Sequence, residues 1–183
     1  MKGVNEALIQ AARSGSEEEL EAVLQDPSCN PLGKDNRGMT ALMHATSSGK
    51  DTCVRLLLPV SDALATDKDG WTALMWAAGS GFEGCVSLLL PASNALAPDN
   101  EGWTALIQAA HAGEEACVKI LLPASDALAR DESGLTAKDW AYKGGYDDLA
   151  RFIGAYVLSK SERNEFEVAT RSDAPSGRSV RRV

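Results

Sequence analysis

The chain has 183 residues, of which 44% are hydrophobic and 24% are charged, and its formal net charge is −8. Residues 1–153 carry 12 Lys and Arg against 22 Asp and Glu, and such an acidic body repels a phosphate backbone, which argues against nucleic-acid binding. No apolar run approaches the roughly 18 residues of a membrane span, and no early apolar segment marks a signal peptide, so we expect a soluble, cytoplasmic protein that binds no membrane.

A five-residue pattern recurs every 32 residues along the chain. Each copy begins with glycine and has Thr-Ala at its third and fourth places. The copies are 38–42 (Gly-Met-Thr-Ala-Leu), 70–74 (Gly-Trp-Thr-Ala-Leu), 102–106 (Gly-Trp-Thr-Ala-Leu) and 134–138 (Gly-Leu-Thr-Ala-Lys). A fixed period in this range indicates a solenoid of stacked units rather than a globular enzyme core.

We therefore expect an all-α solenoid of stacked helix-turn-helix units. One domain, 1–158, would hold five units, followed by an extension over 159–183. The expected units are about 5–34, 35–66, 67–98, 99–130 and 131–158.

The first unit is a degenerate copy of the others. Its apolar residues over 5–24 align with the next unit at an offset of 34, so its connecting loop is two residues longer. Four glutamates between Glu17 and Glu21 suit both a helix start and an end unit with one wet face.

The unit at 67–98 shows the expected anatomy of the first helix. Asp67 and Gly70 stand first and fourth in a type I turn. Thr72 is placed to cap a first helix, which small and apolar residues continue until Gly81 closes it.

A second helix is expected over about 83–90. Pro91 would stop it, because the proline ring cannot continue the hydrogen-bond ladder, and 92–98 would form an extended arm. Neither helix is long enough to be stable alone, so each must bury its apolar face against neighbouring units.

This unit resembles the ankyrin repeat. The family's Asp-x-x-Gly-x-Thr-Pro-Leu-His start, its short first helix and its Val-x-x-Leu-Leu helix lie over residues 35–130 with matched spacing. The shortened units with Leu-Leu-Leu-Pro-Ala-Ser are also similar to the expanded ankyrin sets of some protozoan parasites. The resemblance implies an ankyrin-type solenoid with short turn or hairpin fingers. It also implies a protein partner that meets the turn tips and the first-helix face.

The chain departs from the family pattern in three ways. Alanine replaces the family proline at the start of each first helix, and the loop after the second helix is one residue short and carries proline instead of a glycine cap. Met43, Met75 or Ile107 replaces the family histidine, so we expect the hydrogen-bond network of that histidine to be missing.

The last unit places Lys138 and Asp139 where earlier units have apolar residues, as a polar end cap does. Helical spacing continues from Leu149 to Val157, so the final helix is expected to reach about residue 158, or as far as 168. A disordered tail is expected from about 169. Its arginines could touch an acidic partner or an anionic surface, or be merely solvated; they are Arg178, Arg181 and Arg182.

Three of the four cysteines share one frame position, which is occupied by Cys53, Cys85 and Cys117. Stacked helices lie roughly 8–10 Å apart, beyond the ~7 Å limit for a disulfide and too far for one shared metal ion. We expect buried core thiols and no metal site. Cys29 lies in a loop and could be a free reactive thiol, although nothing beside it predicts a lowered pKa.

No catalytic constellation emerges from the sequence. Residues 79–84 read G-x-G-x-x-G, but a helix precedes them, and only the central glycine recurs in the other units. His44 and His111 occupy different frame positions. We therefore expect neither enzyme activity nor a cofactor.

The remaining signal is the surface. An apolar residue recurs beside each turn, in the row Met39, Trp71, Trp103 and Leu135. Tryptophan is enriched in binding hot spots, although each indole could instead pack on the neighbouring arm and stabilise the stack. By the resemblance, the predicted partner-binding residues are Arg37, Met39, Lys68, Asp69, Trp71, Asn100, Glu101, Trp103, His111 and Leu135.

A second row, formed by His44, Trp76, Gln108 and Trp140, could belong either to the core or to a groove. The main hypothesis is a non-catalytic, monomeric interaction module. The alternative is a regulatory or targeting subunit for an enzyme such as a protein kinase, which Ser172, Ser176 and Ser179 near arginines suggest.

Overall fold

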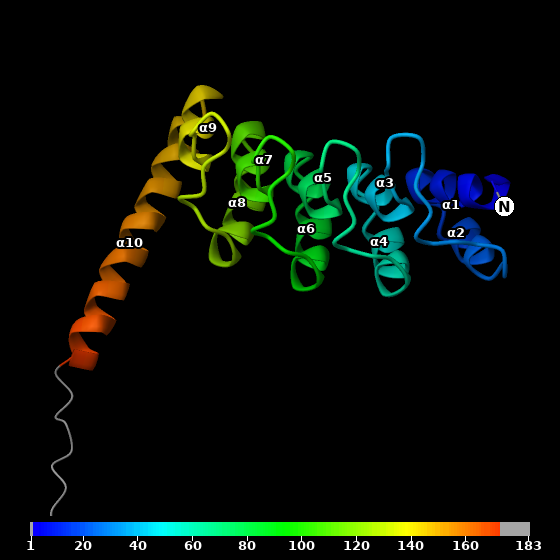
Figure 1. Cartoon of the computed structure of the whole chain (residues 1–183), viewed down its shortest axis with the longest axis horizontal. Coiled ribbons are helices and arrows are strands. Elements are labelled where there is room, and N and C mark those ends of the chain that lie inside the picture. Colours follow the sequence, from blue (N-terminus) through cyan, green and yellow to red (C-terminus); the bar gives the residue numbers. More distant parts are fainter. Residues whose placement is uncertain (1, 173–183) are drawn as a thin grey trace, which may run out of the picture.

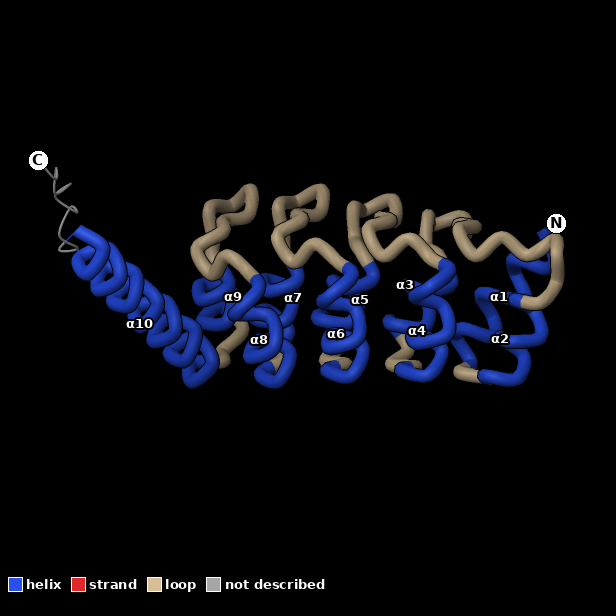
Figure 2. The backbone as a smooth tube through the Cα atoms, turned by 90° about the horizontal axis from the view of Figure 1, so that it is seen from below, coloured by secondary structure: helices blue, strands red, loops and turns tan. Residues whose placement is uncertain are grey.

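Short helices pair along an elongated stack in the computed structural model, which describes residues 2–172 (Figure 1). The first helices of the five pairs are α1 (Lys2–Ser14), α3 (Ala41–Ser47), α5 (Ala73–Gly79), α7 (Ala105–Ala112) and α9 (Ala137–Lys143). Their partners are α2 (Glu17–Leu24), α4 (Asp51–Leu57), α6 (Glu83–Leu89), α8 (Glu115–Leu121) and α10 (Asp147–Ser172). Successive first helices contact one another, as do successive second helices from α2 to α8. The segments between pairs project from one edge of the stack (Figure 2).

The projecting turns are joined to one another by their backbones. The amide of Lys68 donates to the carbonyl oxygen of Arg37 at 3.1 Å. Two further contacts repeat this at the next junctions, from Asn100 to Asp69 at 3.2 Å and from Glu132 to Glu101 at 3.0 Å. Each of the last three turn tips is therefore fixed by the tip before it.

Threonine caps begin the first helices α3, α5, α7 and α9, as the sequence predicts. The hydroxyl of Thr72 accepts from the amide of Met75 at 3.3 Å, and Thr40, Thr104 and Thr136 make the same contact in their own units. Such a cap stabilises a helix start by about 1 kcal/mol, which matters for helices of only seven or eight residues.

The second helices α4, α6 and α8 end within one residue of the predicted limit, but each continues into a short 3₁₀ turn that was not predicted. Helix α6 ends at Leu89, and Pro91 lies inside a 3₁₀ turn, η2 (Leu90–Ala92), which η1 (Leu58–Val60) and η3 (Leu122–Ala124) repeat. Proline fits near the start of such a turn because no backbone donor is needed there.

The predicted extended arm is wrong, because it contains a tight turn. The side chain of Asn94 accepts from the amide of Leu96 at 3.0 Å, and Asn30, Asp62 and Asp126 make the same contact in their units. Each of these turns exposes one leucine. We call these the leucine row: Leu32, Leu64, Leu96 and Leu128.

The shared apolar seam holds the three cysteines, as predicted. Cys53, Cys85 and Cys117 are fully buried and free, and burial raises the pKa of the Cys117 thiol to about 11. The Cys85 thiol donates to a carboxylate oxygen of Asp51 at 2.9 Å, a contact that the sequence analysis missed. Burial, with Asp26 nearby, also raises the pKa of Cys29, so this loop thiol is not activated.

The helices at both ends of the described chain are longer than predicted. Helix α1 begins at Lys2 rather than near residue 5, and α10 continues to Ser172, so residues 169–172 are helical rather than disordered. Leu149 and Ile153 of α10 are buried where it packs on α9, Tyr156 still contacts the core, and the C-terminal part of α10 projects away from the stack (Figure 1). The remaining tail, including Arg178, Arg181 and Arg182, lies outside the described residues.

The tip-to-tip contacts predict unequal effects for two otherwise similar glycines. Gly70 (φ +86°) and Gly134 (φ +76°) both have left-handed backbones, where a Cβ costs roughly 1–2 kcal/mol. A Cβ at Gly70 would lie 2.7 Å from the amide nitrogen of Asn100, whereas one at Gly134 meets no atom within 4 Å.

We expect Gly70→Ala to lower the free energy of unfolding by about 1–3 kcal/mol more than Gly134→Ala does. Urea denaturation followed by circular dichroism measures both. Equal losses in the two variants would show that the tips do not pack as described.

Candidate functional site

An aspartate at the start of each turn organises the surface beside it. One carboxylate oxygen of Asp67 accepts from the amides of Asp69 (3.0 Å) and Trp71 (2.9 Å), which closes the turn. The other oxygen accepts from Nε1 of Trp76 on α5 at 3.0 Å. A single carboxylate thus ties the turn tip to the first helix of its own unit.

The same nine-residue contact recurs in every complete unit, with different donors. Asp35 pairs with Nε2 of His44 at 2.9 Å, Asp99 accepts from Gln108 at 3.3 Å, and Asp131 accepts from Nε1 of Trp140 at 2.7 Å. The second row is mixed between core and surface, because His44 and Gln108 are buried while Trp76 and Trp140 are half-buried. Its side chains lie against the turns, and each carries a polar hydrogen-bonding group at the repeated spacing.

The apolar row beside the turns is only partly a surface. Met39 is 2% exposed and belongs to the core, so it cannot contact a partner and the prediction for it is wrong. Trp71, Trp103 and Leu135 are half-buried and keep part of their side chains in solvent. Indole is rarely buried completely because of its size, whereas the narrow methionine chain fits beneath the turn.

Aromatic rings continue along this face across several units. The ring centroids of Trp71 and Trp76 lie 4.6 Å apart, and those of Trp103 and Trp140 lie 4.5 Å apart. The ring of His111 meets both Trp103 and Trp140 edge-on at 5.1 Å. We call the four indoles the tryptophan strip. The side chains of Trp76 and Trp140 donate hydrogen bonds to the turn aspartates of their units. At Trp71 and Trp103 it is the backbone amide that donates to the turn aspartate.

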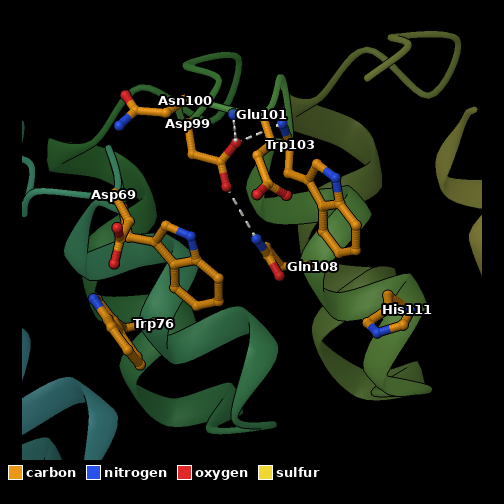
Figure 3. Close-up of a pocket in the computed structure, with 9 residues that line it drawn as sticks. Asp69, Trp76, Asp99, Asn100, Glu101, Trp103, Gln108 and His111 are labelled. Carbon is orange, nitrogen blue, oxygen red and sulfur yellow. Dashed lines mark hydrogen bonds between the residues drawn. The ribbon is translucent and has the colours of Figure 1, made fainter. Parts of the chain in front are cut away.

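A pocket of about 470 Å³ opens in the middle of the tryptophan strip. Figure 3 shows Asp69 and Trp76 on one side, Trp103 and His111 on the other, and Asp99 and Gln108 between them. The hollow lies where the second row has Gln108 in place of the tryptophan found in the units before and after it. We call it the central pocket, and its lining residues are Asp69, Trp71, Trp76, Asp99, Asn100, Glu101, Trp103, Gln108 and His111.

The central pocket brings together six of the ten predicted residues, namely Asp69, Trp71, Asn100, Glu101, Trp103 and His111. Arg37 and Lys68 are exposed on turn tips outside it, and Leu135 lies one unit further along. The pocket also uses Trp76, Asp99 and Gln108, which the predicted set did not contain. The signal that could have found them is an acceptor in each turn followed, nine residues later, by a side-chain donor.

The glycine-rich stretch has the structure of an inter-helix loop, as predicted. Gly79 ends α5, Gly81 has a φ of +75° between the helices, and Gly84 lies in α6. A Cβ on Gly84 would collide with the carboxylate of Asp51, so close packing explains this glycine.

Among the described residues, no group of three or more His, Cys, Asp or Glu side chains is placed to hold a metal ion. In the same part of the chain, no helix is both long and apolar enough to cross a membrane.

A family model described as ankyrin repeats (3 copies) matches residues 8–99 and 92–161, which is most of the chain. The chain belongs to the ankyrin repeat family. Ankyrin repeats generally mediate protein–protein interaction and are typically non-catalytic. No curated protein matches this chain.

The methionines that replace the family histidine make a contact of their own. In α3 and α5 the amides of Thr40 and Thr72 donate to the Sδ atoms of Met43 and Met75, both at 3.5 Å. The thioether of each methionine thus accepts a weak hydrogen bond at the start of its helix, a contact that the sequence pattern did not predict.

The turn aspartate predicts a defined dependence of stability on pH. Burial raises the pKa of Asp35, but hydrogen bonds from His44 and from the amides of Met39 and Arg37 outweigh it, and the pKa falls below its ordinary value of 3.8. A lowered folded-state pKa contributes stability that is present above the unfolded-state pKa. That stability is lost as the pH falls through the folded-state pKa.

We expect Asp35→Asn to cost about 1–3 kcal/mol of unfolding free energy at pH 7. The gap between wild type and variant should close as the pH is lowered from 4 toward 2. Chemical denaturation at several pH values measures the gap, and in a His44→Gln background it should be smaller. A gap that does not change with pH would contradict this assignment.

Proposed function

We propose that this ankyrin chain is a non-catalytic module that binds a protein partner through its turn tips and first-helix face. The observation that supports this most directly is the tryptophan strip with the central pocket in its middle. Large aromatic side chains that remain partly exposed in a fixed frame are typical of interface hot spots.

The frame makes this surface suitable for recognition before any partner arrives. The backbone amides of Trp71 and Trp103 are held by the carboxylates of Asp67 and Asp99, at 2.9 and 2.8 Å. Since the rings are already positioned, little conformational entropy is lost on binding. Arg37 and Lys68, exposed on neighbouring tips, would form the polar rim of the contact.

We extend the proposal to the organisation and location of the chain. Residues 1–158 would act as one interaction domain, in a monomer, with 159–183 as its extension. A cytoplasmic location fits the free thiols, one of which donates to Asp51, because the cytosol keeps thiols reduced. The acidic carboxylates around the pocket disfavour nucleic acid as the partner.

The alternative of a regulatory or targeting subunit for a protein kinase depends on the C-terminal serines. Ser176 and Ser179 lie outside the described residues. The described surface supports binding itself and does not distinguish an enzyme from any other protein partner.

The double substitution Trp71→Ala with Trp103→Ala should abolish capture of the partners that the wild-type chain binds. Affinity capture from native lysate followed by mass spectrometry measures this, with circular dichroism to verify folding. A matched control is Leu64→Ser with Leu96→Ser, which changes two exposed side chains of the leucine row.

The control should retain the wild-type partners. A folded tryptophan variant that captures the same partners as wild type would remove this face from consideration. Loss of partners in the leucine variant alone would move the binding site to the leucine row.

A further inference from the structure

The chain's own cations already lie on the tryptophan strip near its two ends. The guanidinium carbon of Arg37 lies 5.7 Å from the ring centroid of Trp76, and the ammonium nitrogen of Lys143 lies 4.8 Å from that of Trp140. Both distances are within the roughly 6 Å range of a cation–π interaction. The strip therefore presents indole faces in a geometry that accepts positive charge.

The central pocket between these ends has carboxylates but no Lys or Arg in its lining. Asp99 is engaged by two turn amides and by Gln108. Among the residues that the structure describes, no hydrogen bond or ion pair reaches the exposed side-chain carboxylates of Asp69 and Glu101. Within the described part of the chain, the pocket thus offers two carboxylates without a direct hydrogen-bond or ion-pair partner, beside indole rings.

We infer that the central pocket binds the protonated side chain of a Lys or Arg residue, presented by a basic segment of the partner protein. This inference rests on the proposed function, since it names the chemistry that the same face recognises. The carboxylates of Asp69 and Glu101 would pair with the ammonium or guanidinium group, and the indoles of Trp71 and Trp103 would pack against its aliphatic stem and its charge.

The chemistry of the lining favours this ligand over the other classes. An anionic group would face Asp69, Asp99 and Glu101 at close range. A purely apolar side chain would displace water from those carboxylates without replacing its hydrogen bonds. A volume of about 470 Å³ lies in the range of sites that enclose small ligands, so a single side chain can enter it.

The test uses the full chain and four peptides of the form acetyl-Gly-Ala-X-Ala-Gly-amide. The central residue X is arginine, lysine, citrulline or norleucine, so that shape is kept while charge is removed. Binding is measured by the indole NH resonances in ¹H–¹⁵N NMR spectra, with the Trp71 signal assigned from a Trp71→Phe variant. The arginine and lysine peptides should shift the Trp71 resonance and bind about tenfold more tightly than their neutral counterparts.

Two variants separate the pocket from general attraction to an acidic protein. Asp69→Asn with Glu101→Gln should remove the preference for the charged peptides, whereas Glu18→Gln with Glu21→Gln removes two exposed charges from α2 and should leave it unchanged.

Gln108→Trp provides a steric test. It places in the pocket the side chain that Trp76 and Trp140 have at the same frame position, so the stack should fold while the pocket closes. Binding of the arginine and lysine peptides should then be lost.

Equal binding of the arginine and citrulline peptides would overturn the inference, as would unchanged binding to a folded Gln108→Trp variant. A peptide of residues 174–183 that binds more tightly than the arginine peptide would assign the pocket to the chain's own basic segment and overturn the partner assignment.

If Trp71→Ala with Trp103→Ala loses native partners but no cationic peptide binds, the inference fails and the proposed function stands. If cationic peptides bind but no captured protein depends on these tryptophans, the pocket assignment stands and the proposed function fails.

Discussion

The carboxylate of the turn aspartate is the contact on which the rest of the surface depends. In Asp67 one oxygen closes the turn, and the other holds Trp76 on α5. The tip and the helix face are separate stretches of chain, and this single group sets the distance between them. Because every complete unit repeats the contact, the side chains beside the turns line up from unit to unit instead of pointing independently into solvent.

The stack below the turns supplies the rigidity that this arrangement needs. No helix from α2 to α9 exceeds eight residues, so none is stable without its neighbours, and the seam around Cys53, Cys85 and Cys117 is fully buried. In such a quasi-one-dimensional fold each unit is stabilised mainly by adjacent units. The tryptophan strip crosses unit boundaries, for example between Trp103 and Trp140. Its geometry therefore depends on how the units on either side are stacked.

Features that depend on local chemistry repeated in each copy could be predicted from the sequence. The turn at Asp67, the cap at Thr72 and the shared position of the buried cysteines are of this kind. Features that depend on size and tertiary distance could not. Met39 and Trp71 share a frame position, but only the methionine fits into the core. The central pocket lies where the small Gln108 takes the place of the tryptophans found in the units before and after it. A repeating sequence pattern does not predict a pocket at the one unit that departs from it.

The backbone bridges between turns also bear on how such a protein grows in evolution. At each internal junction, a carbonyl group of one tip accepts a hydrogen bond from an amide of the next tip. Within each complete unit, the turn aspartate makes the same contact with the first helix. A duplicated 32-residue segment inserted in frame would therefore find the same hydrogen-bonding groups on the units at either side of it. Gene length and binding-surface length can increase together, while substitutions such as that of tryptophan by Gln108 diversify individual copies without disturbing the register of the others.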